Sequence, residues 1–479
     1  MKGDSPVTRP NILVIMSDEH DPTISTPYGH SFVRTPYQQR LADEGAVFQN
    51  AYCNSPLCVP SRASFMTGLQ LHRTRVWDNT IPLASDIPTW AHRLNNAGYE
   101  TVLCGKMHFI GPDQLHGFTH RIMPDIHGQG GYHTNLPDWT TGKLADPLAV
   151  SDRLTKDTGP GDTVHQRFDD EAARRAVTYL LDGDRHERPW AMCVGIFAPH
   201  FPFRVRPEYY YGYYPEHADL PRTPTLPLDE SHPQTHRLRD HFQAENITEE
   251  QIRVARAAYY GLTEFGDDKI GEILAAVDAN GLANNTIVVY TSDHGESLGE
   301  HGLWYKCTFY DPSTRVPLIV RWPGVVKPGS RHKQVTSLLD LVQTMLDVAG
   351  ADPGDTDGVS LAPLLRGDAE DDDGEAFSEY HAHGTTTPGR MLRRGRYKLN
   401  YYLGDPPELF DLEADPDELT DLASNPAHAE TVTEMTIAIL NGWDAEAIKA
   451  DIIAGQQDRM LINRSMGGQP YTPAWAGGD

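Results

Sequence analysis

Short apolar runs alternate with amphipathic stretches along the first three quarters of the chain. Runs of five to seven mostly apolar residues are typical of strands that are covered on both faces of a sheet. We expect strands at 11–16, 100–104, 191–197, 286–291 and 317–321. Between these runs apolar residues recur at helical spacing, which predicts helices at 36–44, 89–97, 170–181 and 338–349. The alternation predicts an α/β fold, in which helices sandwich one large and mostly parallel sheet.

The pattern changes near residue 368. Residues 368–375 read Asp-Ala-Glu-Asp-Asp-Asp-Gly-Glu, a charged run that is typical of a linker or an exposed loop. Three short strand patterns and one helical pattern follow, at 391–394, 397–402, 408–412 and 427–440. A chain of 479 residues exceeds what one hydrophobic core usually supports. We therefore expect two domains, a larger one at 1–367 and a small α+β domain at 376–455.

Polar residues directly follow four of the predicted strands. In α/β sheets the carboxyl ends of parallel strands meet at one edge, where ligands bind. Hard divalent cations require several oxygen ligands from separate rigid elements. We therefore expect the two acidic groups of this set to meet at one metal, although Asp18 alone can cap a helix and Asp293 alone can form a turn. The four groups are Asp18 with Glu19, Lys106 with His108, His200 alone, and Asp293 with His294.

Acidic residues outnumber basic ones by 67 to 41, which gives a net charge of −26. This charge opposes non-specific binding to nucleic acids and to anionic membranes. No apolar run approaches the roughly 20 residues that span a bilayer, and the first residues do not form a secretory signal. Five cysteines without paired spacing argue against a disulfide framework. We expect a cytoplasmic protein that binds neither nucleic acid nor membrane, and that attracts any anionic substrate through local positive charge.

One pentapeptide, Cys58-Val59-Pro60-Ser61-Arg62, stands out for its chemistry. Four defined positions of this kind arise by accident in a chain of this composition with a probability on the order of 10⁻³. A structural interpretation is a buried cysteine at the start of a helix that ends at Gly68. The pentapeptide also resembles the sulfatase signature, in which a maturation enzyme oxidises the cysteine to the aldehyde formylglycine. The nucleophile would then be made after translation and would not be one of the encoded amino acids.

The resemblance extends along most of residues 9–367. Successive stretches are similar, in the family's order, to the signatures of the formylglycine-dependent sulfatases of the alkaline-phosphatase-like superfamily, and 407–412 resembles their short final domain. Within this group the chain is similar to bacterial arylsulfatases, choline sulfatases and phosphonate monoester hydrolases. The resemblance implies an enzyme that hydrolyses small sulfate monoesters, aryl or alkyl, to an alcohol and sulfate. The matching stretches are 11–18, 58–68, 105–108, 199–200, 291–295 and 304–317.

Carried over to this chain, the family's catalytic residues include Cys58, Arg62, Lys106 and His108. The resemblance implies that the hydrated aldehyde of matured Cys58 attacks the sulfur and displaces the alcohol. Arg62 would hold the hydrate and neutralise the carboxylates of the metal site. Lys106 would contact the hydrate and a sulfate oxygen, and His108 would take a proton from the second hydroxyl so that sulfate is released.

Two further residues, His200 and Lys306, are implied to contact the sulfate and the leaving oxygen. His200 is the better candidate for the acid, because the ordinary pKa of histidine lies nearest neutrality. Asn79 occupies a position where these relatives have a polar pocket residue, and a substrate contact and a turn residue are equally open interpretations. The stretches 111–170 and 201–245 contain aromatic residues that would suit an aryl group, or a quaternary ammonium held by cation–π attraction.

The resemblance also implies one divalent metal, calcium or magnesium, held by Asp18, Glu19, Asp293, His294 and matured Cys58. Common sulfatases have a second Asp where this chain has Glu19, and an Asn where it has His294. An imidazole ligand adds manganese, zinc and iron to the candidates. A histidine in the ligand set also resembles the phosphonate monoester hydrolases. A phosphonate monoester or phosphodiester hydrolase is therefore an alternative. A non-catalytic metal-binding relative with an unmodified thiol is a third interpretation.

The expected partners are a small anionic ester substrate and the formylglycine-generating maturation enzyme. The last residues, 456–479, lack sustained periodicity and form either a disordered tail or an arm that packs on a neighbouring subunit. Such arms brace the oligomers of similar choline sulfatases. A homo-oligomer, either a dimer or a tetramer, is therefore also expected.

Overall fold

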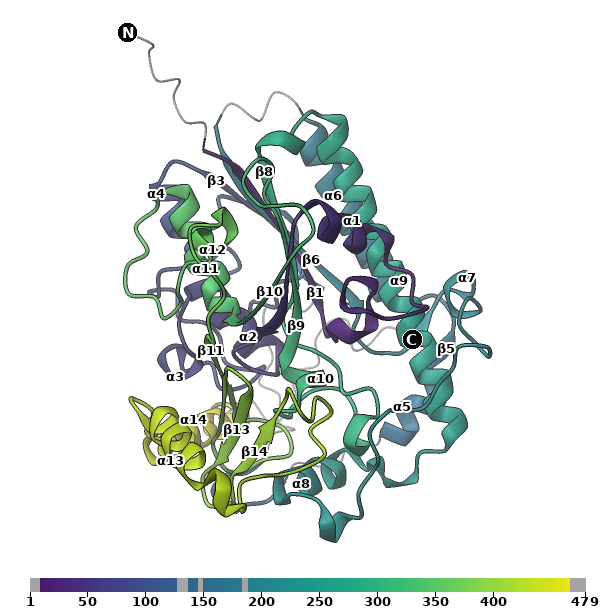
Figure 1. The fold of residues 1–479 in the computed structure, drawn as a ribbon, viewed down its shortest axis with the longest axis vertical. Coiled ribbons are helices and arrows are strands. Elements are labelled where there is room, and N and C mark those ends of the chain that lie inside the picture. Colours follow the sequence, from purple (N-terminus) through teal and green to yellow (C-terminus); the bar gives the residue numbers. More distant parts are fainter. Residues whose placement is uncertain (1–8, 127–136, 145–149, 183–187, 466–479) are drawn as a thin grey trace.

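A computed structural model describes residues 9–126, 137–144, 150–182 and 188–465. Its larger part is built on one eight-stranded sheet (Figure 1). In spatial order the strands are β10 (Ser330–Ser337), β2 (Ala46–Tyr52), β9 (Arg315–Arg321), β8 (Thr286–Ser292), β1 (Asn11–Asp18), β6 (Trp190–Pro199), β3 (Glu100–Gly105) and β4 (His120–Met123). The predicted class, an α/β fold with a large central sheet, is confirmed.

Most neighbouring strands in this sheet are parallel. Strand β1 pairs in parallel with β6 and β8, and β3 pairs in parallel with β6. Strand β9 runs antiparallel to both β2 and β8. All five predicted strands are present, and β2, β4 and β10 are additions that the sequence pattern did not indicate. Because β8, β1, β6 and β3 are parallel neighbours, their carboxyl ends meet at one edge.

Strand β1 shows why helices cover both faces of the sheet. All eight of its residues are buried, and successive side chains point to opposite faces. Leu13 and Ile15 belong to one apolar core, whereas Ile12 and Val14 belong to another. Figure 1 shows α1 (Pro36–Glu44), α6 (Val164–Leu181) and α9 (Glu249–Ala279) on one side, and α2 (Cys58–Thr67), α4 (Trp90–Asn96), α11 (Leu338–Ala349) and α12 (Ala362–Arg366) on the other.

The four predicted helices are all present. Helices α1 and α11 have the predicted bounds, α4 follows its cap Thr89, and α6 begins earlier than predicted because Thr163 caps it. Helix α9 was not predicted, because its buried residues leave no narrow apolar stripe. Among the described residues, no helix has both the length and the apolar composition that a membrane span requires. Shorter elements are α3 (Leu71–Thr74), α5 (Val150–Lys156), α7 (Pro207–Tyr210), α8 (Pro233–Phe242), α10 (Asp311–Thr314), β5 (Gly159–Pro160) and β7 (Arg204–Val205).

The C-terminal region is a second, smaller α+β unit. The acidic run lies between α12 and this unit, and its residues 368–373 are exposed. Four antiparallel strands are followed by two helices. These elements are β11 (Glu375–Tyr380), β12 (Gly389–Arg394), β13 (Tyr397–Tyr402), β14 (Glu408–Asp411), α13 (Ala429–Leu440) and α14 (Ala445–Ser465). Of these, β12, β13, β14 and α13 correspond to the predicted elements, whereas β11 and α14 were not predicted.

Helix α14 crosses the boundary that we predict at residue 456. The tail therefore starts inside a helix, which corrects the expectation that 456–479 lacks regular structure from its first residue. The physical reason is a tertiary contact: the side-chain amide of Gln456 bonds to the Pro137 carbonyl at 2.8 Å and to the Trp139 N–H at 3.1 Å. Residues 466–479 lie outside the described residues.

A buried charge joins the two units. The side chain of Lys398, on β13, is fully buried, and its Nζ lies 2.8 Å from Asp311 Oδ1 and 2.8 Å from the Phe309 carbonyl oxygen. Glu418 forms a second ion pair with the same ammonium. Because Asp311 belongs to α10 of the larger unit, this lysine holds the C-terminal sheet against the site-bearing sheet.

We predict that Lys398→Ala strongly destabilises the protein, because it leaves two buried carboxylates without their cation. Removing one partner of a buried pair costs about 3–5 kcal/mol. Lys327 is exposed, and Lys327→Ala is the matched control, with an expected change within about 0.5 kcal/mol. Thermal unfolding of the two variants measures the difference. Equal unfolding temperatures would show that Lys398 does not hold the units together.

Candidate active site

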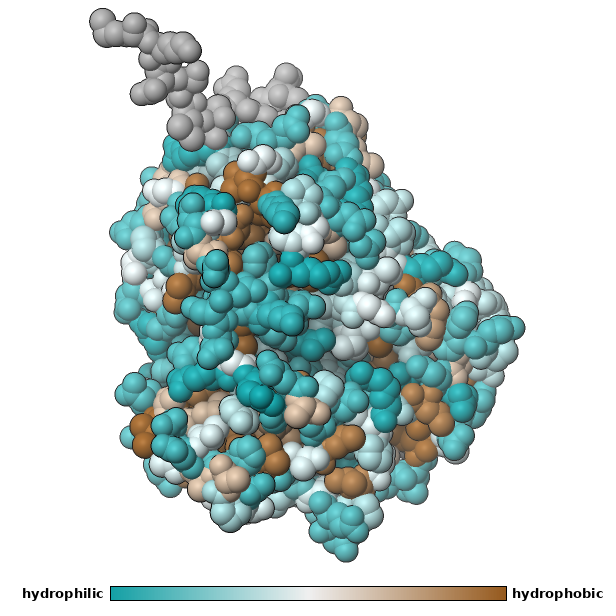
Figure 2. All heavy atoms as spheres, in the orientation of Figure 1, coloured by the Kyte–Doolittle hydropathy of each residue, from teal (hydrophilic) through white to brown (hydrophobic). Residues whose placement is uncertain are grey.

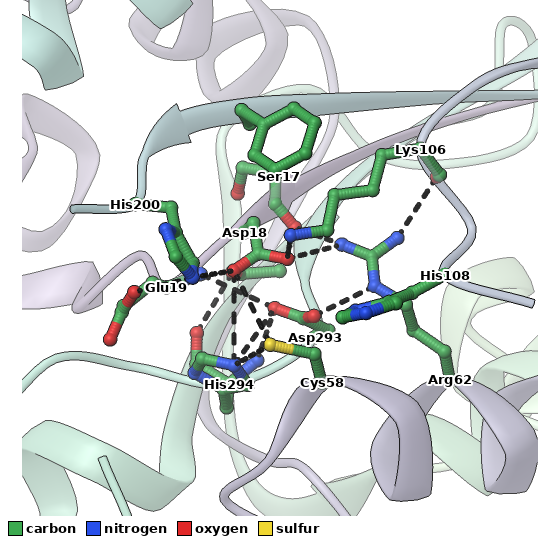
Figure 3. A network of polar contacts seen from close by, with 12 residues as sticks. Ser17, Asp18, Glu19, Cys58, Arg62, Lys106, His108, His200, Asp293 and His294 are labelled. Atoms are coloured by element: carbon green, nitrogen blue, oxygen red, sulfur yellow. Dashed lines mark hydrogen bonds and ion pairs between the residues drawn. The ribbon is translucent and has the colours of Figure 1, made fainter. Parts of the chain in front are cut away.

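Five segments from distant parts of the chain meet at the carboxyl edge of the sheet (Figure 3). Asp18 ends β1, Asp293 follows β8, Lys106 follows β3, and His200 follows β6. Cys58 is the first residue of α2 and lies at the same place. The parallel register explains the convergence, since Asp18 lies opposite Pro199 and Ser17 lies opposite Ser292. The sheet thus brings together side chains that the sequence separates by up to 275 positions.

Arg62 lies at the base of the site, between two carboxylates. Its Nη2 is 3.0 Å from Asp18 Oδ2, and its Nε is 2.8 Å from Asp293 Oδ2. Lys106 Nζ adds a second cation, 2.5 Å from Asp18 Oδ2. All four side chains are at most 1% exposed. Burial alone would raise the pKa of Asp18, but Lys106, His200 and Arg62 hold it well below its ordinary value.

Asp18, Cys58, Asp293 and His294 form a buried group with the character of a metal site. One ligand atom from each lies within 4.8 Å of the others. His294 Nδ1 is 2.9 Å from the Gly295 carbonyl oxygen, so Nδ1 carries the proton and Nε2 presents its lone pair. The Nε2 atom lies 3.7 Å from Asp293 Oδ1 and 3.9 Å from Asp18 Oδ1. Two carboxylates and an imidazole fit a divalent cation.

Cys58 is an inert thiol in its unmodified form. Its Sγ lies 3.2 Å from His294 Nε2 and 3.8 Å from Asp18 Oδ1. Burial, reinforced by the charge of Asp18, raises the pKa of this thiol to about 12. A thiol that stays protonated is a poor nucleophile. The position of Cys58 is therefore central, but its native chemistry is weak.

Glu19 lies apart from the group that contains His294. Its carboxylate is 3.1 Å from Lys306 Nζ and 3.3 Å from His200 Nε2, and it groups with Asp18 and His200 instead. The Tyr259 hydroxyl donates to the Glu19 carbonyl at 2.7 Å, and this bond holds a backbone with φ of 65°. Of the five predicted metal-binding residues, four share one group, and Glu19 instead contacts Lys306 and His200.

His200 and Lys306 contact each other. Lys306 Nζ donates to His200 Nε2 at 3.2 Å, and His200 Nδ1 donates to the Phe201 carbonyl. Burial and the charge of Lys306 lower the pKa of His200 well below its ordinary value. For Lys306, burial acts to lower the pKa, but Cys58, Glu19 and Asp18 raise it above its ordinary value. The pair is therefore a neutral imidazole beside a charged ammonium.

Three buried carboxylates hold the chain segments that lead to His108, His200 and Lys306, and each accepts two backbone N–H groups. Asp125 accepts from Met107 and His108, at 2.9 and 2.6 Å. Asp169 accepts from Phe197 and Ala198, just before His200, at 2.7 and 2.9 Å. Glu296 accepts from Leu298 and Tyr305, just before Lys306, at 2.8 and 2.7 Å.

These contacts hold loops of unusual backbone shape. His108, Tyr305 and Cys307 have positive φ values of 59°, 65° and 81°, which side-chain-bearing residues rarely adopt. Figure 3 shows the His108 imidazole directed toward Asp293 and Cys58. Sequence reasoning missed the three carboxylates, because no local spacing links each of them to its loop. Glu296 alone carried a signal, since it lies two residues after His294.

The structure also shows the contacts of Asn79 and of the aromatic stretches. Asn79 Oδ1 accepts from the Val59 N–H at 3.0 Å, so this side chain satisfies a free donor in the first turn of α2. The tyrosine run at 209–214 packs on α9, where the hydroxyls of Tyr209 and Tyr213 each lie 2.7 Å from a carboxylate. Residues 127–136, with Tyr132 and His133, lie outside the described residues.

The chain is similar to known proteins over most of its length. The family model for Sulfatase matches residues 10–351, and the model for the C-terminal part of N-sulphoglucosamine sulphohydrolase matches residues 299–442. A choline-sulfatase from Rhizobium meliloti (strain 1021) is 37% identical, over 97% of this chain and 93% of that protein. Arylsulfatase K from Danio rerio is 32% identical, over 87% and 80% respectively.

Among solved structures, the phosphonate monoester hydrolase of Agrobacterium radiobacter is similar with a TM-score of 0.75 and 26% identity, covering 90% of this chain and 95% of that chain. A putative sulfatase from Bacteroides thetaiotaomicron is similar with a TM-score of 0.72 and 27% identity, covering 95% and 94%. The matched length and the similar fold both indicate the same family. The chain belongs to the sulfatase family of alkaline-phosphatase-like proteins and is a sulfatase.

Proposed function

We propose that this sulfatase hydrolyses small aryl or alkyl sulfate monoesters through Cys58, after its oxidation to formylglycine, and one divalent metal. The observation that carries the proposal is the position of Cys58. Its Sγ lies within the group of Asp18, Asp293 and His294, yet burial keeps the thiol protonated. A residue placed at the centre of the charges but inert as a thiol is best explained by a modified side chain.

The modified side chain supplies two oxygens on one carbon when the aldehyde is hydrated, one to carry the sulfate and one to expel it. Cys58 is only 2% exposed in the folded protein. A maturation enzyme must therefore reach it before folding is complete. Of the neighbouring residues, Arg62 holds the two carboxylates in place, and Lys106 presents a positive charge to the hydrate and to a sulfate oxygen.

Lys306 and His200 serve the leaving group in this mechanism. Lys306 pairs with the Glu19 carboxylate, and its ammonium stabilises the negative charge that develops on the leaving oxygen. Neutral His200 accepts a hydrogen bond from Lys306 and orients it. This assignment reverses the order expected from the sequence, in which His200 was the better acid. His108, held by Asp125, takes the proton from the second hydroxyl so that sulfate can leave.

Asp18, Asp293, His294 and residue 58 would hold the divalent metal. The bound cation supplies a positive charge that lowers the energy of oxygen anions in the site. Calcium, magnesium, manganese, zinc and iron are the candidates, because both hard oxygen ligands and an imidazole are present. The contacts of Glu19 with Lys306 and His200 favour a role as their counter-ion over a role as a ligand.

A second candidate function is the hydrolysis of phosphonate monoesters or phosphodiesters at the same site. It is favoured by His294, whose imidazole lies 3.2 Å from Cys58 Sγ, and by the similarity to a phosphonate monoester hydrolase. The two are separated by kcat/KM on matched aryl sulfate and aryl phosphonate esters. A higher value on the phosphonate would replace the sulfate proposal with this one.

We predict that the peptide containing Cys58 is about 18 Da lighter than its sequence mass when the protein is made together with a maturation enzyme. Cys58→Ala should remove turnover of 4-nitrophenyl sulfate and leave thermal unfolding unchanged. The matched control is Cys53→Ala, also a buried cysteine, which should keep activity within a few-fold. A peptide of unmodified mass in an active preparation would contradict the proposed nucleophile. A peptide of unmodified mass in an inactive preparation would favour the non-catalytic interpretation.

We further predict that Glu296→Gln retains activity while Glu296→Ala loses it. Glutamine keeps the oxygen that accepts from Leu298 and Tyr305, whereas alanine leaves both N–H groups buried and unpaired. Each such group costs about 1–3 kcal/mol, and a displaced Lys306 costs about 100-fold in rate. The measurements are kcat and KM on 4-nitrophenyl sulfate, with thermal unfolding alongside. If glutamine is as damaging as alanine, charge and not positioning is the role of Glu296.

A further inference from the structure

An aromatic wall, formed by Phe201 and Tyr305, lies beside the two residues assigned to the leaving group. The Phe201 ring stacks on His200 with centroids 4.2 Å apart, and it lies 4.4 Å from the Tyr305 ring. Lys306 Nζ lies 5.0 Å from the centre of the Phe201 ring. Phe201 directly follows His200 in the chain, and Tyr305 directly precedes Lys306. The wall therefore lies on the side of the site that receives the alcohol.

Arg153, on helix α5, lies over this wall. Its guanidinium carbon is 5.2 Å from the centre of the Phe201 ring and 5.7 Å from the centre of the Tyr305 ring. The residue is half-buried, and within the described part of the chain no acidic side chain forms an ion pair with it. Stacking on two rings and a side-chain hydrogen bond with Tyr305 hold the guanidinium in place, and a guanidinium has five N–H donors, so others remain for a ligand. A positioned cation with free donors can bind an anion.

The two cations that contact Phe201 are close enough for one substrate to reach both. Arg153 and Lys306 each lie about 5 Å from the centre of the same ring, so they are no more than about 10 Å apart. That span matches an ester whose sulfate meets Lys306 and whose alcohol part, the size of one ring, carries a second charged group. Planar guanidinium donors suit carboxylates and sulfates in two-point hydrogen bonding.

We propose that Arg153 is a specificity-determining residue, and that the substrates are sulfate monoesters whose alcohol part carries a second anionic group, a carboxylate or another sulfate. The inference rests on the proposed function, because it assigns the alcohol side of the same site. It also separates this chain from its choline-sulfatase relative. A quaternary ammonium would meet a ring already in contact with two cations, and each like charge costs about 1 kcal/mol or more at such distances.

Three esters test the proposal, using the matured enzyme with its metal. The first is 4-carboxyphenyl sulfate, the second is the methyl ester of the same compound, which is neutral and similar in shape, and the third is choline sulfate. The wild-type protein should give the highest kcat/KM on the carboxylate. Arg153→Gln should lower that value about tenfold, mainly through KM, leave the neutral ester within about twofold, and raise the value for choline sulfate.

Two variants sharpen the test. Arg153→Lys keeps the charge and should recover part of the preference for the carboxylate. Lys156→Gln removes a cation from the same helix, where Lys156 is exposed and pairs with Asp152, so it should change none of the three values. Added salt should reduce the preference of the wild-type protein, because the attraction is between charges.

Equal losses on the carboxylate and its methyl ester in Arg153→Gln would overturn the proposal while the sulfatase activity stands. Preference of the wild-type protein for choline sulfate would overturn it as well. Failure of the matured wild-type protein to hydrolyse any sulfate ester would overturn the proposed function and this inference with it.

Discussion

The site depends on one guanidinium that holds two carboxylates from separate strands. Arg62 pairs with Asp18 at the end of β1 and with Asp293 after β8, and both carboxylates are fully buried. Without a cation between them, two such charges would repel each other strongly in the protein interior. Arg62 lies one helical turn after Cys58, so the same ion pairs set the position of the residue that we assign as the nucleophile.

The same principle extends outward from this centre: a carboxylate orders each positively charged or basic group. Asp125, Asp169 and Glu296 bind backbone N–H groups in the loops of His108, His200 and Lys306, while Glu19 faces the ammonium of Lys306 itself. A preorganised arrangement of this kind does not need to rearrange during the reaction. It also explains how a chain with a net charge of −26 can present a site that attracts anions.

The sequence predicts the centre of this structure better than its periphery. The central strands are continuous apolar runs, and the polar residues that end them, such as Asp18, Asp293 and Lys106, reach the site because parallel strands end at one edge. Helix α9 and strands β2 and β10 have weaker apolar patterns in the sequence. Their formation depends on tertiary packing. Asp125, Asp169 and Arg153 carry no local signal, because their partners are remote in the chain. The pKa of His200 depends on burial beside Lys306, which no spacing reveals.

The central claim is that residue 58, as formylglycine, and a divalent cation share the pocket formed by Asp18, Asp293 and His294. A high-resolution crystal structure of protein made with a maturation enzyme, with anomalous data at the absorption edges of manganese, iron and zinc, tests it most directly. We expect one metal peak bonded to Asp18, Asp293 and His294, next to density for an oxygen-bearing side chain at residue 58. An intact thiol at residue 58, or a pocket without a metal peak in active protein, would contradict it.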